Sequence, residues 1–326
     1  MIEGIDAADI SDIGLRRPTN QDCFVAADGV YVVCDGMGGA QAGERASAIA
    51  AEEMARLETL DTRTRADVRA ALDAAQGRDR ALGVSLGGIA GTTVTGIVCA
   101  GDLGARHGRH AGGIVDAVAQ VASFGDEDPD ATVTSDGTLE RVEVGDDATL
   151  APADGPAGGE GAPAEGPGPV CFVVNVGDSR TYHLSRFPDG SLNEQSFLQL
   201  THDHSRRQEA IDHGMDEQVA TRTIARNVIT QCVGAPGGIR PDIVAVRARG
   251  RFIICSDGLH GEVDDATIAS IGASHADARE AAAALVDAAL RAGGSDNVTV
   301  IVVDMPYRAA APVAVAPEGA DVTLRT

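Results

Sequence analysis

The chain has few aromatic residues and no tryptophan. Aromatic side chains make up 3% of its 326 residues, whereas hydrophobic residues make up 44% and charged residues 23%. The last two fractions are those of an ordinary soluble globular protein. The core must therefore be built mainly from alanine and aliphatic side chains, and the length allows one large core or two small ones.

Positive charge is also scarce. The formal net charge is −23 and the isoelectric point is about 4.5. A general nucleic-acid binder, or a protein that docks on anionic membranes, needs a basic face, so we expect neither partner. Part of the acidity is local, because residues 126–165 contain 12 acidic residues and one basic residue.

The sequence has no long apolar run, no basic N-terminus and no cysteine spacing typical of a metal site. No run approaches the ~20 apolar residues that span a bilayer. The first residues, MIEGIDAADISD, are acidic and do not resemble a signal peptide. The six cysteines have no CxxC spacing and mostly lie in apolar segments, at positions 23, 34, 99, 171, 232 and 255. We expect buried, reduced cysteines, a cytoplasmic protein and no zinc site.

The apolar pattern predicts strands and a few grouped helices. Nearly continuous β-branched runs predict strands covered on both faces at 30–34, 92–99, 170–176, 251–255 and 298–303. Helical patterns occupy 41–57, 64–75 and 275–292, the last capped by Ser274 and ended by Gly293 and Gly294. Irregular strand spacing with short turns favours a layered α+β fold with antiparallel sheets over repeated βαβ units.

We expect a main domain at residues 1–307, a flexible tail at 308–326 and an insert at 101–169. Of the residues from 152 to 169, 11 of 18 are proline or glycine, which is too poor a composition for a dense core. Within the insert, residues 131–144 would suit a hairpin around Asp136-Gly137. The insert is either an inert linker or an acidic docking arm.

Five aspartates lie at the edges of apolar runs: Asp22, Asp35, Asp178, Asp257 and Asp296. Three come at the ends of VYVVCDG, CFVVNVGDS and RFIICSDG, and one opens SDNVTVIVV. A carboxylate beside a buried strand is unfavourable unless a cation or a hydrogen-bond network offsets it. Repeated beside glycine, serine or asparagine, the pattern predicts a site for a hard divalent metal such as Mg²⁺ or Mn²⁺.

Simpler explanations exist for several of these residues. Asp35-Gly36 would also suit a strand-to-helix turn, although a phosphate loop is disfavoured because the G-x-G-x-x-G spacing fails and no lysine follows. Asp178 would also suit a tight turn in which it pairs with Arg180. Arg17 is either a surface arginine or a group that grips phosphate through two hydrogen bonds.

Other polar residues complete the candidate site. The Asn297 side chain is placed to orient the carboxylate of Asp296. His202 and His204 are potential metal ligands, but we favour a role in fixing their loop. The G-x-S-x-G motif is absent, so a serine nucleophile has no support.

The order of these motifs resembles the metal-dependent serine/threonine protein phosphatases of the PPM (type 2C) family, most closely the bacterial branch. The resemblance covers roughly residues 9–304 except the insert. It rests on SDIGLRRPTNQDCF (11–24), VVCDGMGG (32–39), GTTV (91–94), VNVGDSRTYHL (174–184), LTHDHS (200–205), NVITQCVG (227–234), ICSDGL (254–259) and GGSDNVTVIVV (293–303). It implies a four-layer α/β/β/α sandwich with two central antiparallel sheets and a centre of two Mn²⁺ or Mg²⁺ ions, with a third ion bound more weakly.

The resemblance also implies a role for each aspartate. Asp35 would bridge both metals, and the carbonyl of Gly36 would complete one coordination shell. Asp257 and Asp296 would bind the other metal. Asp178 would belong to the third, weaker site.

The N-terminal motif carries the remaining implied roles. Asp22 would contact the metals through water, and Arg17 would bind the substrate phosphate. Gln21 stands where many members have glutamate, and Met37 stands where animal members have a histidine proposed as the general acid. Our hypothesis is that water on the third metal protonates the leaving group. Residues 205–228 are shorter than the flap that bacterial members carry beside the substrate.

The implied function is that of a signalling hydrolase. A metal-activated water would hydrolyse phosphoserine and phosphothreonine in proteins and so oppose a serine/threonine kinase. The expected partners are phosphoproteins, namely that kinase and its targets, and we expect a monomer. The alternatives are a catalytically weak phosphatase-like regulatory or binding module, and a regulator dedicated to one anti-sigma-type phosphoprotein.

Overall fold

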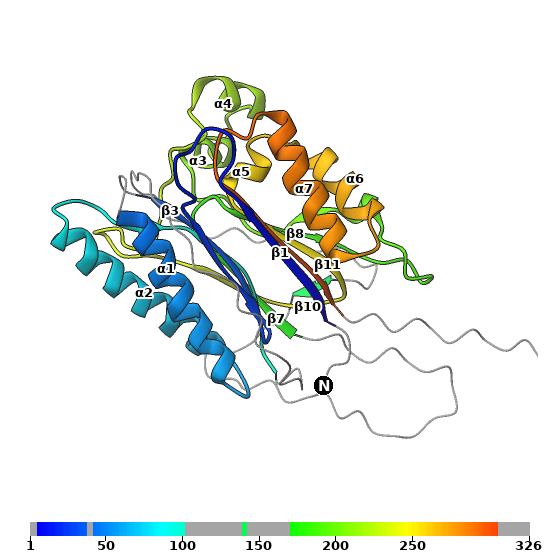
Figure 1. Cartoon of the computed structure of the whole chain (residues 1–326), viewed down its shortest axis with the longest axis horizontal. Helices are drawn as coiled ribbons and strands as arrows, with labels where there is room; N and C mark the ends of the chain where they lie inside the picture. The colour runs from blue at the N-terminus through cyan, green and yellow to red at the C-terminus, as the bar shows by residue number, and fades with distance from the viewer. Residues whose placement is uncertain (1–4, 38–41, 102–138, 142–169, 306–326) are drawn as a thin grey trace, which may run out of the picture.

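Two antiparallel sheets pack face to face and each carries helices on its outer side (Figure 1). The computed structural model describes residues 5–37, 42–101, 139–141 and 170–305. Helices α1 and α2 cover one sheet, and α6 and α7 cover the other. The predicted four-layer α/β/β/α sandwich is confirmed.

Both sheets are built from antiparallel neighbours. The first has the order β1 (Asp6–Asp12), β12 (Val298–Met305), β11 (Gly250–Cys255), β8 (Arg180–Leu184) and β9 (Leu198–Gln199). The second has the order β2 (Asp22–Ala27), β3 (Val30–Met37), β5 (Val94–Cys99), β7 (Val170–Val176), β10 (Asp242–Ala248) and β6 (Leu139–Arg141), with β4 (Gly91–Thr92) beside β3.

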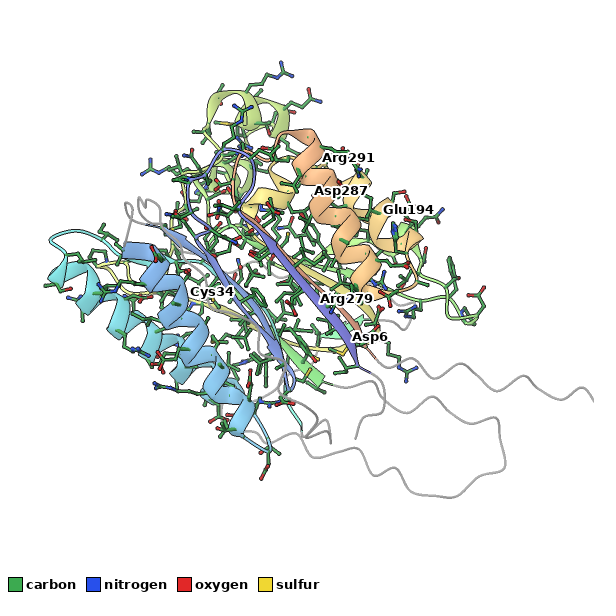
Figure 2. The ribbon with its side chains drawn as sticks, in the orientation of Figure 1. Asp6, Cys34, Glu194, Arg279, Asp287 and Arg291 are labelled. Atoms are coloured by element: carbon green, nitrogen blue, oxygen red, sulfur yellow. The ribbon has the colours of Figure 1, made fainter. Side chains whose placement is uncertain are left out.

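Successive side chains of a central strand point to opposite faces of its sheet, and both faces are buried, so the apolar runs are continuous. In β3, Val32 and Cys34 face the helices, whereas Tyr31 and Val33 face the other sheet. Figure 2 shows Cys34 on the helix side of its sheet. Because both faces are buried, no polar residue interrupts the pattern until Asp35. All six cysteines are buried and free, as predicted.

The helices over the second sheet form a hairpin. Helix α1 spans Ala42–Ala55 and continues into a 3-10 turn at Arg56–Thr59. Helix α2 spans Arg65–Ser85, ten residues beyond the predicted end. It begins in a capping box between Thr64 and Asp67. The prediction was too short because it ended at residue 75, before the second half of the apolar stripe, which includes Leu82.

The helix predicted over 275–292 is confirmed, but it begins three residues later and its predicted cap is wrong. Ser274 is the last residue of α6 (Asp265–Ser274), and α7 spans Ala278–Ala292. Asp277 caps α7, because its carboxylate accepts from the backbone N–H groups of Arg279 and Glu280 at 2.8 and 3.0 Å. Gly293 ends the helix, as predicted.

Short helices gather at one end of the two sheets (Figure 1). Residues 205–228 form α3 (Arg206–Asp212) and α4 (Glu217–Thr223), while α5 (Asp257–His260) follows β11 directly. A further 3-10 turn occupies Glu194–Ser196. None of the described helices has both the length and the apolar character needed to cross a membrane.

The insert contributes one described element. Strand β6, at residues 139–141, pairs with β10 through the register Val246↔Arg141. The rest of the insert, including the hairpin predicted around Asp136-Gly137, and the predicted tail at 308–326 lie outside the described residues.

Candidate metal centre

The two sheets bring their acidic strand ends together at the end that carries α5. Asp22 and Asp35 lie opposite each other in the register of β2 and β3. The backbone of Asp35 is fixed on its other side, because its N–H donates to Thr93 Oγ1 at 3.0 Å and its carbonyl accepts from Thr92 Oγ1 at 2.9 Å. Gly36 pairs with Thr92 where β3 runs beside β4.

Asp257 and Asp296 come from the other sheet, and close backbone packing joins their segments. A Cβ atom on Gly258 would lie 1.9 Å from the carbonyl oxygen of Asn297. A Cβ atom on Gly14 would lie 2.1 Å from the carbonyl oxygen of Asp296, and Gly14 also has a φ of +75°. Glycine is therefore required at both places for these segments to meet.

Asp22 ties one sheet to the other. The residue is 3% exposed. One carboxylate oxygen accepts hydrogen bonds from Ser256 Oγ, directly after β11, at 2.8 Å and from Thr299 Oγ1 of β12 at 2.6 Å. Burial raises the pKa of Asp22 to about 7 against the opposing effect of these hydroxyls. This position suits the predicted contact through water rather than direct metal binding.

The buried carboxylates repel one another. Burial raises the pKa of Asp35 well above its usual range, and the charges of Asp22, Asp257, Asp296 and Asp178 raise it further. A bound cation would offset the repulsion between these carboxylates and favour their ionised form. Their oxygen donors match the preference of Mg²⁺ and Mn²⁺, so these residues fit the predicted ions.

Two arginines favour the ionised form of Asp257, which is the form that binds a cation. Burial and the charge of Asp296 raise the pKa of Asp257 to about 6, while Arg226 and Arg17 oppose the shift. Asp178 shows the same behaviour, because burial and the charges of Asp257 and Asp203 raise its pKa. The predicted ligands therefore interact electrostatically as one cluster.

The Asp296 carboxylate accepts hydrogen bonds from the chain on both oxygens. Arg17 forms an ion pair with Oδ2, and the backbone N–H of Asn297 donates to Oδ1 at 2.9 Å. Within the described ranges, no three histidine, cysteine or acidic side chains already converge as a preformed metal cage. Metal binding at this position would therefore exchange the Arg17 contact for a cation.

The Asn297 side chain does not orient Asp296, and that prediction is wrong. Its Oδ1 accepts from the N–H of Gln21 at 2.7 Å, and its Nδ2 donates to the carbonyls of residues 13 and 19 at 2.9 Å each. A short amide side chain can satisfy several backbone groups at once. Asn297 therefore fixes the loop that carries Arg17.

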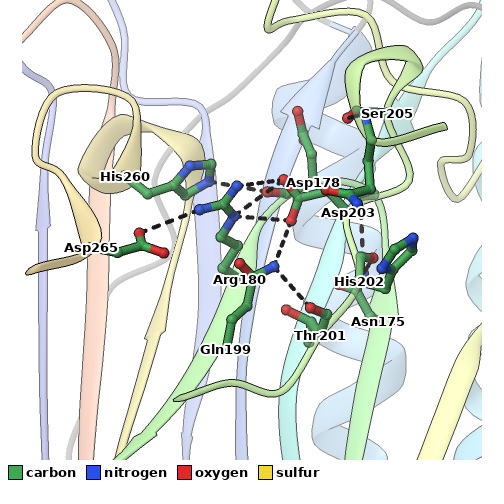
Figure 3. A network of polar contacts seen from close by, with 12 residues as sticks. Asn175, Asp178, Arg180, Gln199, Thr201, His202, Asp203, Ser205, His260 and Asp265 are labelled. Atoms are coloured by element: carbon green, nitrogen blue, oxygen red, sulfur yellow. Dashed lines mark hydrogen bonds and ion pairs between the residues drawn. The ribbon is translucent and has the colours of Figure 1, made fainter. Parts of the chain in front are cut away.

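Asp178 does not pair with Arg180 as the tight-turn alternative required. The guanidinium of Arg180 donates to the carboxylate of Asp203 at 2.9 and 2.7 Å, and to Asp265 Oδ1 at 3.4 Å (Figure 3). Two parallel hydrogen bonds to Asp203 outweigh a single contact within a turn. Asp178 as a whole residue is 7% exposed, and it lies among acidic neighbours.

The two histidines after β9 fix their loop, as favoured. His202 Nε2 bonds to Asp212 Oδ2 at 2.8 Å. His204 Nδ1 accepts from the N–H of Gly177 at 3.1 Å, and its Nε2 bonds to Asp242 at 3.1 Å. Both ring nitrogens of His204 are used in this way, which leaves it no free nitrogen for a metal.

Two residues beside the cluster were missed by sequence reasoning. Arg226, which follows α4, donates to the carbonyl of Gly261 and to Ser295 Oγ, and its charge favours ionised Asp257. His260 bonds to the carbonyl of Asp178. Its position three residues after Asp257 in a helix was the available signal, because such residues share a face.

Comparison with known proteins identifies relatives of the whole fold. No protein-family model matches the chain. The chain is 28% identical over 305 residues to the serine/threonine protein phosphatase PstP of Mycobacterium tuberculosis, which covers 90% of this chain and 44% of that protein. It spans about half the length of the curated relatives it matches.

Solved structures show similarity of the fold as well as of the sequence. The crystal structure of the M. tuberculosis phosphatase PstP/Ppp superposes with a TM-score of 0.66 at 25% identity, covering 93% of this chain and 99% of that one. A structure of the PstP catalytic domain with two manganese ions superposes with a TM-score of 0.62 at 25% identity, covering 92% and 97%. In its two-sheet sandwich and its strand-end aspartates, the chain is similar to the bacterial serine/threonine phosphatases of the PPM type.

Proposed function

We propose that the chain hydrolyses phosphoserine and phosphothreonine in proteins with the help of Mn²⁺ or Mg²⁺. The observation that carries the proposal is the buried group of mutually repelling carboxylates at the joint end of the sheets, with Arg17 beside it. The manganese ions in the PstP catalytic domain support the same assignment.

Each residue has a distinct part in this proposal. Asp35, Asp257 and Asp296 would hold two ions together with the carbonyl of Gly36, and Asp178 would hold a third. Such ions, when bound, lower the pKa of a coordinated water and neutralise charge on a phosphoryl group. The residues of the chain fix the position of that chemistry, since both sheets hold their strand ends rigidly.

Asp22 and Arg17 would act beside the ions. Asp22 is too enclosed by the Ser256 and Thr299 hydroxyls to move far, so it would orient water at the centre. Arg17 has a side chain that is 37% exposed, which leaves its guanidinium accessible to an incoming phosphate. A planar guanidinium can bind two phosphate oxygens in parallel.

Replacing Arg17 by alanine should raise the KM for a phosphothreonine peptide by about tenfold or more, because a hydrogen bond to a charged group contributes about 1.5–3 kcal/mol. Steady-state kinetics at saturating Mn²⁺ measure the change. The matched control is Arg16→Ala, which removes the same charge from the adjacent exposed position. Equal effects of the two variants would refute a specific phosphate contact.

The proposed activity implies a cellular setting. The substrates would be phosphoproteins, including the targets of a serine/threonine kinase and the kinase itself, in a cytoplasmic signalling role. The net charge of −23 disfavours nucleic-acid and anionic-membrane partners. We propose a monomer, which sedimentation at micromolar concentration would test.

A metal-dependence assay separates this function from a phosphatase-like binding module. The protein should hydrolyse a panel of phosphoserine and phosphothreonine peptides with Mn²⁺ or Mg²⁺, and lose that activity with a chelator. Calorimetry should show Mn²⁺ binding. A binding module would fail both measurements, whereas metal binding without hydrolysis of any peptide would favour a dedicated regulator that needs one particular phosphoprotein.

A further inference from the structure

His260 links the two segments that carry Asp178 and Asp257. It is the last residue of α5, which begins at Asp257. Its ring nitrogen Nε2 lies 3.0 Å from the backbone carbonyl oxygen of Asp178, in the turn after β7 (Figure 3). A carbonyl oxygen can only accept, so Nε2 carries the hydrogen and donates it.

His260 is a neutral donor in this position. Burial and the neighbouring charge of Arg180 lower the pKa of its imidazole to about 3. The ring therefore adds a directed hydrogen bond to the acidic cluster without adding a charge. It differs in this respect from Arg17 and Arg226, whose charges act on the carboxylates directly.

The rest of the Asp178 turn is fixed on its other sides. The N–H of Gly177 donates to His204, and the carbonyl of Gly177 accepts from the N–H of His204 at 2.9 Å. Ser179 Oγ bonds to Thr93 Oγ1 at 2.9 Å. These contacts hold the turn to its own sheet and to the loop after β9. Towards α5, the backbone pairing of Arg180 with Cys255 ends two residues short of Asp178 and Asp257.

Arg180 anchors the chain just beyond the turn. Its guanidinium is bound to Asp203 and Asp265, and it also donates to the hydroxyl of Tyr182 at 3.1 Å. Tyr182 in turn donates to Asp265 at 2.9 Å. This network orients the start of β8, so His260 is the described side chain that connects α5 to the Asp178 peptide itself.

We propose that His260 is a positioning residue, whose hydrogen bond to the Asp178 carbonyl sets the distance between the Asp178 and Asp257 carboxylates and thereby the affinity of the weaker metal site. The inference rests on the proposed metal-dependent function. Partners that orient metal ligands typically contribute about 10- to 100-fold in metal affinity or activity.

The test compares His260→Gln with His260→Asn. A glutamine amide nitrogen reaches nearly as far as Nε2 of histidine, whereas an asparagine amide nitrogen reaches only as far as Nδ1. We expect His260→Asn to weaken Mn²⁺ binding in the weaker calorimetric phase by about 10- to 100-fold. Glutamine should restore most of that affinity. Amide hydrogen exchange of residues 178 and 179 should be faster in the asparagine variant.

His183→Ala is the matched control. His183 is also a buried neutral histidine whose Nε2 donates to a backbone carbonyl, that of Arg249 at 2.7 Å, but it lies farther along β8, in the register opposite Phe252. Its loss should leave the Mn²⁺ phases of the folded protein unchanged. Thermal unfolding without metal reports how much stability each variant loses.

The outcomes separate the inference from the function on which it rests. If the unaltered protein binds Mn²⁺ and hydrolyses phosphopeptide, but His260→Asn binds Mn²⁺ as tightly, the inference is overturned and the function stands. A glutamine variant as defective as the asparagine variant would also overturn it. If the unaltered protein binds no Mn²⁺, the proposed function fails, and the inference fails with it.

Discussion

Replacing Asp35 by asparagine should reduce Mn²⁺-dependent hydrolysis of a phosphothreonine peptide by at least about a thousandfold. Metal ions supply several kcal/mol of transition-state stabilisation, and each 1.4 kcal/mol is a factor of about ten in rate. Asp35 is the carboxylate whose charge is opposed by all four other aspartates of the cluster. Asp35 would hold both proposed ions, and an amide carries no charge to offset theirs, so both should be lost from calorimetric titrations.

The same variant should remain folded and should gain stability in the absence of metal. It removes one like charge from a buried cluster, and its backbone contacts to Thr92 and Thr93 are unaffected. Thermal unfolding in chelator measures this gain. Asp287→Asn is the control, because Asp287 is an exposed residue of α7 that pairs with Arg291 on the outer surface (Figure 2). Undiminished activity of the Asp35 variant would exclude the proposed metal centre.

Replacing Asp79 by asparagine should stabilise the protein by up to about 4 kcal/mol at pH 7. Asp79 lies on α2, is 0% exposed, and among the described residues neither of its carboxylate oxygens has a hydrogen-bond partner. Burial raises its pKa to about 8, with a smaller opposing effect from Arg78. The folded protein must therefore keep Asp79 protonated at neutral pH, which the unfolded chain does not.

The gain should depend on pH in a defined direction. The pKa of Asp79 is higher in the folded protein than the unfolded value of about 3.9. The unfolding free energy of the unaltered protein is therefore not reduced by Asp79 below pH 4, and it declines as the pH rises towards 8. The asparagine variant has no such decline. The difference in unfolding free energy between the two proteins should grow from near zero at pH 4 to its maximum near pH 8, as measured by urea titration.

A neighbouring aspartate provides the control for Asp79. Asp73 lies on the same helix, but it is exposed and pairs with Arg69 at 3.0 Å. Asp73→Asn should change stability by a few tenths of a kcal/mol at most, since exposed pairs four residues apart contribute about 0.3–0.5 kcal/mol. A pH-independent difference for the Asp79 variant would contradict a buried protonated carboxyl group.

The features that the sequence predicted correctly are those with a local cause. Each central strand is covered on both faces, so its composition alone marks it as a strand. The strand-end aspartates stand out because the apolar run stops at a charged residue, as at Asp35 and Asp257. Their order along the chain then made the family resemblance specific.

Most of what the sequence left open or predicted wrongly depends on partners distant in sequence. Arg180 binds Asp203 rather than its near neighbour Asp178, and Asn297 binds the loop at residues 13–21 rather than Asp296. Which of two candidate partners a polar side chain takes is decided by the tertiary fold. The cap of α7 was a local error, because both Ser274 and Asp277 are suitable capping residues.

The hydrophobic layer between the two sheets has a further consequence. The candidate ligands are divided between the sheets, with Asp35 on one and Asp257 on the other. The inner layer, which includes Tyr31, Phe252 and Ile301, sets how far one sheet is displaced over the other, together with the hydrogen bonds of Asp22. Substitutions in this layer, remote from any metal ligand, would then change which metal the centre prefers. Changes in the two helix-facing layers would alter stability and leave selectivity unchanged.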